Sequence, residues 1–175
     1  LLHALADPGE RPQIGSKFGS ALAADGGLAV VGAPYTDLQG LTDVGIAYVI
    51  DTATGARVAT HRAPTPVAGN LFGYAVAIAG NTVAVAAIGD DNGALQSGAV
   101  HIFEASSGNL IRTIANPTPA VSDAFGRRMA LSGRTLVVGV AADEAAYVID
   151  ALNGALLRPP ANPAHAPRDQ FGSAV

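Results

Sequence analysis

The dipeptide Phe-Gly recurs four times along this chain of 175 residues, beginning at Phe18, Phe72, Phe125 and Phe171. Successive copies are 54, 53 and 46 residues apart, and the residues around each copy repeat as well. A fixed period near fifty residues is the signature of an array of supersecondary units. The period therefore predicts a repeat architecture rather than one irregular core.

Each unit contains four short apolar runs. A tight Gly-containing turn of the kind that suits hairpins separates the first two runs, and the dense Val and Leu of the second predict a strand covered on both faces. An acid opens and a Gly closes the turn after the third run, as in 51–55, 104–108 and 150–154, and a proline follows the fourth run eight residues before the next Phe. The runs are 18–23, 28–31, 45–50 and 56–60, then 72–78, 83–87, 98–103 and 109–114, then 125–131, 136–140, 145–149 and 155–157.

Four antiparallel strands per period of about fifty residues are typical of a β-propeller blade. No segment carries the apolar spacing of a helical repeat. The expected fold is all-β, with about three full blades and a partial strand at each end. The predicted units are an outer strand and connector at 1–17, blades at 18–71, 72–124 and 125–170, and the first strand of a following blade at 171–175.

Charge and composition exclude several classes of function. The formal net charge of −4 argues against nucleic-acid binding, which needs basic surface. The absence of cysteine excludes disulfides and thiolate metal sites. No apolar run reaches the roughly 20 residues that span a bilayer, so membrane insertion is not expected.

Three segments of the first unit carry a resemblance to a known family: Phe18-Gly19-Ser20-Ala21, then Val30-Val31-Gly32-Ala33-Pro34-Tyr35, then 45–50. In these the chain resembles the FG-GAP repeat family, the propeller repeats of integrin α-subunit heads and of many bacterial extracellular proteins. The second and third units keep Phe-Gly and lose Gly-Ala-Pro. The resemblance implies a secreted protein, outside the cell or at its surface, of bacterial type.

Family members often hold calcium in an acidic loop between the first two strands of a blade. In this chain that connection is a tight turn in all three units, and Asp25 is its only acid. Because Ca²⁺ takes six to eight oxygen ligands, no cofactor is expected at the usual place.

Three blades do not close a ring, since propellers need roughly four to eight. One interpretation is that the chain is a segment of a longer propeller whose further blades complete it. The other is self-assembly, in which copies join edge to edge by strand addition.

The connection between the second and third strands varies in length, and such variation on one face is where binding usually occurs. Asp90, Asp91 and Asn92 form the densest group of oxygen ligands, a possible calcium or magnesium site or a solvated turn. In the equivalent loop of the first unit, Asp37 and Asp43 with Tyr35 suggest a ligand or partner surface, or again a solvated loop.

Catalytic patterns are absent from the sequence. His101 takes the position of Tyr48 and Tyr147 in the other units, which suggests a structural replacement. No two histidines have metal-ligand spacing, and no Gly-x-Ser-x-Gly elbow or phosphate-binding loop occurs. We therefore expect no enzyme activity in this chain.

The repeating phenylalanines, Phe18, Phe72, Phe125 and Phe171, are expected to pack between adjacent blades, with their glycines allowing close backbone approach. The function that fits best is a non-catalytic extracellular scaffold for protein binding, adhesion or assembly. The alternatives are a propeller accessory to a secreted enzyme and a carbohydrate-binding module, for which Tyr35 and Tyr74 are the candidate aromatic contacts.

Overall fold

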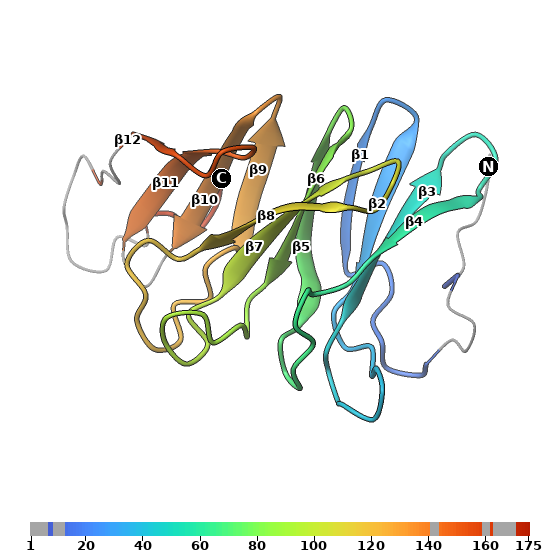
Figure 1. Ribbon diagram of the computed structural model, residues 1–175, viewed down its shortest axis with the longest axis horizontal. Helices are drawn as coiled ribbons and strands as arrows, with labels where there is room; N and C mark the ends of the chain where they lie inside the picture. Colours follow the sequence, from blue (N-terminus) through green and yellow to red (C-terminus); the bar gives the residue numbers. More distant parts are fainter. Residues whose placement is uncertain (1–6, 9–12, 141–143, 159–161, 163–170) are drawn as a thin grey trace.

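The computed structural model describes residues 7–8, 13–140, 144–158, 162 and 171–175, and these form three four-stranded antiparallel sheets. Figure 1 shows the sheets side by side in chain order. We call them blades 1, 2 and 3. Blade 1 comprises β1 (Ala21–Asp25), β2 (Leu28–Ala33), β3 (Ile46–Asp51) and β4 (Arg57–His61); blade 2 comprises β5 (Phe72–Ala79), β6 (Thr82–Ala87), β7 (Ala99–Glu104) and β8 (Leu110–Ala115); blade 3 comprises β9 (Arg128–Ser132), β10 (Thr135–Val140), β11 (Ala145–Asp150) and β12 (Leu156–Arg158).

Within each blade the strands follow one another as a meander, β1-β2-β3-β4 in blade 1 and likewise in the other two. The sheets do not close on one another within the described residues, so the predicted all-β fold with an incomplete ring of blades is confirmed. The turn between the first two strands and the turn between the last two lie at one edge of every blade (Figure 1). The connections between the second and third strands lie at the opposite edge.

The predicted acid-to-glycine turn has the same geometry in blades 1 and 3. Asp51 Oδ1 accepts hydrogen bonds from the backbone N–H groups of Ala53 and Thr54, and Asp150 Oδ1 does the same for Leu152 and Asn153. The strand pairing shifts by one residue beside each turn, at Val49/Ile50, Ile102/Phe103 and Val148/Ile149. These repeated bulges bend the outer strand of every blade in the same way.

The apolar core is divided between blades. One cluster of buried residues joins Val30, Ala47 and Val49 of blade 1 to Phe72 of blade 2. A second cluster joins blade 2 to Phe125 and its neighbours in blade 3. Blade-to-blade packing therefore supplies most of the buried surface, as the near-continuous apolar pattern of the second strands suggests.

The four repeating phenylalanines differ in their burial. Phe72 and Phe125 are fully buried, and both lie in clusters that span two blades. Phe18 is half-buried, with its ring centroid 5.9 Å from that of Tyr48 on the face of blade 1 that points away from blade 2. Phe171 is half-buried as well.

The first strands begin later than expected in blades 1 and 3. Phe18-Gly19-Ser20 is a turn, and β1 begins only at Ala21. The backbone has a positive φ on both sides of each Phe, 53° and 87° at Lys17 and Gly19, 55° and 91° at Leu71 and Gly73, and 52° and 92° at Ala124 and Gly126. Phe-Gly is a turn in blades 1 and 3, whereas in blade 2 Phe72 pairs with Ala87 and the register shifts before Val76.

At Gly73 and Gly172 the glycine of Phe-Gly lies where two backbones cross, and at Gly126 it lies against the Ala86 side chain. A Cβ on Gly73 would be 2.5 Å from the Ile46 carbonyl oxygen, and a Cβ on Gly32 would be 2.0 Å from the Gly73 oxygen. Gly172 makes the equivalent crossing over Gly139 of blade 3. The glycines thus allow each new blade to begin directly against the preceding one.

A set of backbone hydrogen bonds joins each blade to the next. The N–H groups of Gly69, Leu71 and Phe72 donate to carbonyls 42, 43 and 44 in the β2–β3 loop. The N–H groups of residues 122, 124 and 125 donate to carbonyls 95, 96 and 97 in the β6–β7 loop in the same way. We call this arrangement the backbone clamp. It uses the long loop of one blade to hold the start of the following blade.

The two ends of the chain lie against the outer blades. Arg57 Nη1 donates to the Pro8 carbonyl over 3.1 Å, and burial, followed by the nearby Asp7 carboxylate, raises the pKa of Tyr48. The outer strand expected at residues 1–5 lies outside the described residues. Residues 171–175 contain the Phe-Gly turn and no strand, so the first strand of a following blade stays a prediction. No helix suited to crossing a membrane occurs in the described part of the chain.

Candidate functional site

The loops that differ most between blades lie together at one edge of the molecule (Figure 1). The β2–β3 loop covers residues 34–45 and the β6–β7 loop covers residues 88–98. Residues 141–143 of the corresponding loop in blade 3 lie outside the described residues. Every predicted ligand or metal residue lies in the first two loops.

The loop of blade 1 is held by its own polar groups. Gln13 and the backbone of Asp37 exchange two hydrogen bonds, of 2.7 and 2.8 Å. Asp37 Oδ1 accepts the N–H of Asp43 over 2.9 Å. The structure therefore brings these two predicted residues together, with one oxygen of Asp37 used to shape the loop.

Tyr35, the third predicted residue of this surface, is half-buried. The Lys17 ammonium nitrogen lies 4.0 Å from the centre of its ring, a cation–π contact. One face of the ring is thus already covered within the chain.

The loop of blade 2 uses its acids in a similar way. Asp90 Oδ1 accepts the N–H of Asn92 over 2.9 Å, and Asp91 Oδ1 accepts the N–H of Gln96 over 2.8 Å. Ser97 Oγ donates to the Asn92 carbonyl. In the described part of the chain no three His, Cys, Asp or Glu side chains lie together as metal ligands. The calcium or magnesium site suggested by this loop stays a prediction.

His101 lies directly behind the Asp90 loop, on β7. Its ring is 2% exposed, and Nδ1 lies 3.0 Å from Thr113 Oγ1. Nε2 is 4.0 Å from Asp90 Oδ2, too far for a hydrogen bond, and has no hydrogen-bond partner among the described residues. Burial lowers the pKa of His101 to about 4, although the nearby Asp90 carboxylate acts in the opposite direction.

These groups border a pocket of about 390 Å³. One wall comes from the connector between blades 1 and 2, and the other comes from the Asp90 loop, with His101 and Thr113 between them. The sequence did not reveal this pocket because its two walls are at least twenty residues apart in the chain.

A second histidine is buried nearby. His61, on β4, is 1% exposed and stacks on Phe103 with ring centroids 4.5 Å apart. Burial lowers its pKa to about 4, and the backbone of Gly108 offsets this only in part. Neither ring nitrogen has a hydrogen-bond partner within the described segments.

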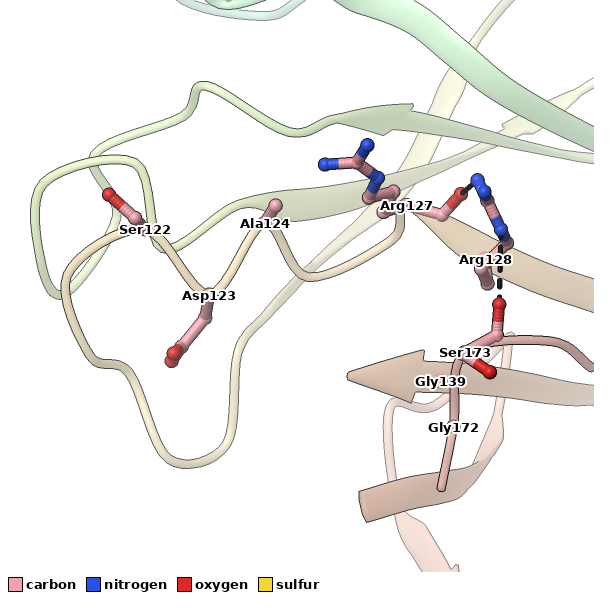
Figure 2. A pocket seen from close by; sticks show the side chains of 8 residues that line it. All are labelled: Ser122, Asp123, Ala124, Arg127, Arg128, Gly139, Gly172 and Ser173. Atoms are coloured by element: carbon pink, nitrogen blue, oxygen red, sulfur yellow. Dashed lines mark hydrogen bonds between the residues drawn. The ribbon is translucent and has the colours of Figure 1, made fainter. Parts of the chain in front are cut away.

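A smaller pocket of about 240 Å³ lies where the Phe-Gly turn at residues 171–173 meets blade 3. Figure 2 shows its two arginines with their side chains directed apart. Arg128 donates to the carbonyls of Arg127 and Ser173, and the Arg127 guanidinium lies 5.7 Å from the Tyr74 ring centre. The dashed lines in Figure 2 show that Arg128 holds the turn that follows blade 3, which is a structural role.

Comparison with known proteins identifies a matching repeat family and solved structures with a similar fold. Residues 13–50 and 62–103 match the model of the FG-GAP repeat, which covers most of blades 1 and 2. A search of curated proteins by sequence found no match.

Solved structures with a similar fold include designed and natural proteins. The computationally designed Ika4 protein is 24% identical, with a TM-score of 0.58 over 90% of this chain and 77% of that chain. BamB from Moraxella catarrhalis is 20% identical, with a TM-score of 0.54 over 89% of this chain and 41% of its own. Kluyveromyces lactis Hsv2 is 18% identical, with a TM-score of 0.53 over 78% of this chain and 38% of its own.

The chain thus spans well under half of the length of BamB or Hsv2, and at these identities the likeness concerns the fold alone. BamB and the designed proteins are propeller-type folds. The chain therefore carries FG-GAP repeats at residues 13–50 and 62–103 and is built of consecutive β-propeller blades.

Proposed function

We propose that this chain is a non-catalytic extracellular scaffold of bacterial type, completed by further blades, by a protein partner or by copies of itself. The observation that carries the proposal is the outer face of blade 3. It repeats a face that is fully buried in blade 2.

The outer face of blade 3 is apolar and half-buried. Val137, Ala146 and Val148 alternate along β10 and β11 with residues of the core, so they lie on the side away from blade 2. Their equivalents in blade 2 are Ala84, Val100 and Ile102, which are fully buried against blade 3. This face of the sheet is therefore covered by the next blade in blade 2, whereas in blade 3 the equivalent face is open.

The outer face of blade 1 is buried within the chain at Val31, Ile46 and Tyr48 and is exposed at its first strand. Leu22 pairs with Val31 across β1 and β2 and is 65% exposed. Its equivalent in blade 2 is Val76, which is buried in the cluster between blades 1 and 2. The outer face of blade 3 is therefore the main candidate contact, because exposed apolar patches mark interaction sites, and Leu22 is a single exposed apolar residue on blade 1.

Two further observations support a scaffold. The loop acids of blades 1 and 2 use carboxylate oxygens to shape their own loops, as a structural role requires. FG-GAP repeats are typical of extracellular proteins, which supports a location outside the cell.

Carbohydrate binding has less support, because both candidate aromatic contacts are engaged by cations of the chain. Lys17 lies over Tyr35, and Arg127 lies over Tyr74. Each cation covers one face of its ring, and both tyrosines are half-buried, which leaves less ring surface for a sugar.

Light scattering across a concentration series tests the proposal. A chain with an open apolar blade face should form larger species as its concentration rises, because that face can cover the same face of a second copy. A strict monomer at all concentrations, with no partner captured on immobilised chain, would contradict the scaffold function.

A further inference from the structure

The pocket beside His101 has a marked charge. Asp90 and Asp91 line it, and no Lys or Arg is among its lining residues. At about 390 Å³ it falls at the lower end of the range for small-molecule sites. Its electrostatics therefore favour a cationic group over an anion.

The pocket also contains a buried polar atom without a partner. His101 Nε2 has no hydrogen-bond partner among the described residues, in a side chain that is 2% exposed. Buried polar groups in folded proteins are nearly always paired, so an unpaired one needs an explanation. Asp90 Oδ2 lies 4.0 Å away, a separation at which one donor group can bond to both atoms.

The hydrogen bond of His101 Nδ1 leaves Nε2 able to accept a hydrogen bond from such a donor. When Nδ1–H donates to Thr113 Oγ1, over 3.0 Å, Nε2 carries a lone pair and accepts. The pocket then offers two acceptors, a ring nitrogen and a carboxylate oxygen, and the adjacent Asp91 adds negative charge.

We propose that this pocket binds a primary ammonium group, namely a lysine side chain presented by a protein partner. His101 Nε2 and Asp90 Oδ2 accept its hydrogen bonds, and its aliphatic stem lies against Pro64 and Val67 at the connector wall. The proposal rests on the proposed function, because it gives the chemistry by which the scaffold recognises a partner.

An ammonium fits better than the other cations. An arginine guanidinium prefers both oxygens of one carboxylate, and Asp90 Oδ1 is already bonded to Asn92 N–H. Calcium needs six to eight oxygen ligands, whereas an ammonium has only three protons to donate.

Nuclear magnetic resonance titration of the whole chain tests the proposal. The probe is N-acetyl-lysine N-methylamide, and its neutral counterpart is N-acetyl-norleucine N-methylamide. The lysine probe should shift the His101 ring nitrogens and the 90–97 amides saturably, and the norleucine probe should not. Asp90→Asn should weaken binding about tenfold or more, because a charge-assisted hydrogen bond is lost.

Asp25→Asn is the matched control. It removes the same charge at the opposite edge of the molecule, where Asp25 Oδ2 accepts the Gly80 N–H, and should leave lysine binding unchanged. Asp91→Asn supplies a second test within the pocket should Asp90→Asn lower the melting temperature.

Equal shifts with both probes would overturn the proposal, as would unchanged binding by Asp90→Asn and Asp91→Asn. Saturable shifts with CaCl₂ and none with lysine would make the loop a metal site instead. A chain that binds the lysine probe but no protein would overturn only the proposed function. A chain that assembles through its blade faces and ignores the probe would overturn only the lysine pocket.

Discussion

Phe72 is the residue on which the packing of blades 1 and 2 depends most. Its ring is fully excluded from solvent and lies 5.9 Å from Phe103 and 5.6 Å from His101. Phe72→Ala should cost about 3–5 kcal/mol of unfolding free energy, through lost burial and a residual cavity. Urea denaturation would measure it.

Phe18→Ala is the comparison, because Phe18 occupies the same repeat position and is only half-buried. Phe18→Ala should lower the unfolding free energy by clearly less than Phe72→Ala does. A loss below about 1 kcal/mol for Phe72→Ala would contradict the packing role.

The two buried histidines make stability depend on pH. Burial lowers the pKa values of His61 and His101 to about 4, below the value of 6.5 for an exposed histidine. The unfolded chain therefore binds protons first as the pH falls, and stability is lost between about pH 6.5 and pH 4. Each histidine contributes at most roughly 3 kcal/mol to that loss.

His61→Phe combined with His101→Tyr should flatten this part of the pH profile, since Tyr48 and Tyr147 already fill the equivalent position in the other blades. Denaturation at pH 7 and pH 5 would show the effect. An equally steep profile in the double variant would show that other groups dominate.

At the scale of the strand, the crossing of Gly32 with Gly73 predicts that stability is unusually sensitive to a side chain at position 32. Gly32→Ala would place its Cβ 2.0 Å from the Gly73 carbonyl oxygen, and a backbone atom cannot move aside easily. We expect a loss of about 1–3 kcal/mol or more, in the range of overpacked cores. Thermal unfolding would measure it.

Blade 2 supplies the control, because Ala86 stands at the position equivalent to Gly32 and its Cβ is 2.9 Å from the position of a Cβ on Gly126. Ala86→Gly should change stability much less than Gly32→Ala. Similar effects at both sites would mean that the crossing is not a tight contact.

The strand pattern was predictable because the repeat supplies three copies of the same information. Hairpin turns, acid-to-glycine turns and buried second strands all follow from local residue types. The start of β1 at Ala21 was not predictable, because the same Phe-Gly dipeptide forms a turn in blade 1 and opens a strand in blade 2. The backbone clamp was missed for a related reason, since it is made of main-chain atoms that no side-chain pattern records.

The candidate site was only partly predictable. The sequence pointed to the Asp90 loop, and the structure places that loop on a pocket. It could not show that His101 lies behind Asp90, because main-chain hydrogen bonds of the β6–β7 loop, such as Gly98 N–H to the Asp90 carbonyl, place them together.

At the scale of the whole molecule, the open outer face of blade 3 predicts that the same substitution has different effects on stability in blades 2 and 3. Val148 is half-buried, and Ile102 is its fully buried equivalent in blade 2. Val148→Asp should leave the melting temperature nearly unchanged and reduce association, whereas Ile102→Asp should unfold the chain because an unpaired charge is buried. Thermal unfolding and light scattering would distinguish them.

Persistent association in Val148→Asp would show that this face is not the contact. A large loss of stability in the same variant would show that the face is already covered within the chain.

The backbone clamp also bears on how such a chain grows. The first two units show the donors of the clamp beside the connector and the acceptors in the long loop, so a duplicate of either unit brings both halves with it. Because main-chain atoms make the joint, neighbouring units need no matched side chains there. A gene that copies or deletes one fifty-residue unit would therefore yield a chain whose joints still fit, and the number of blades can change faster than the sequence of any one of them.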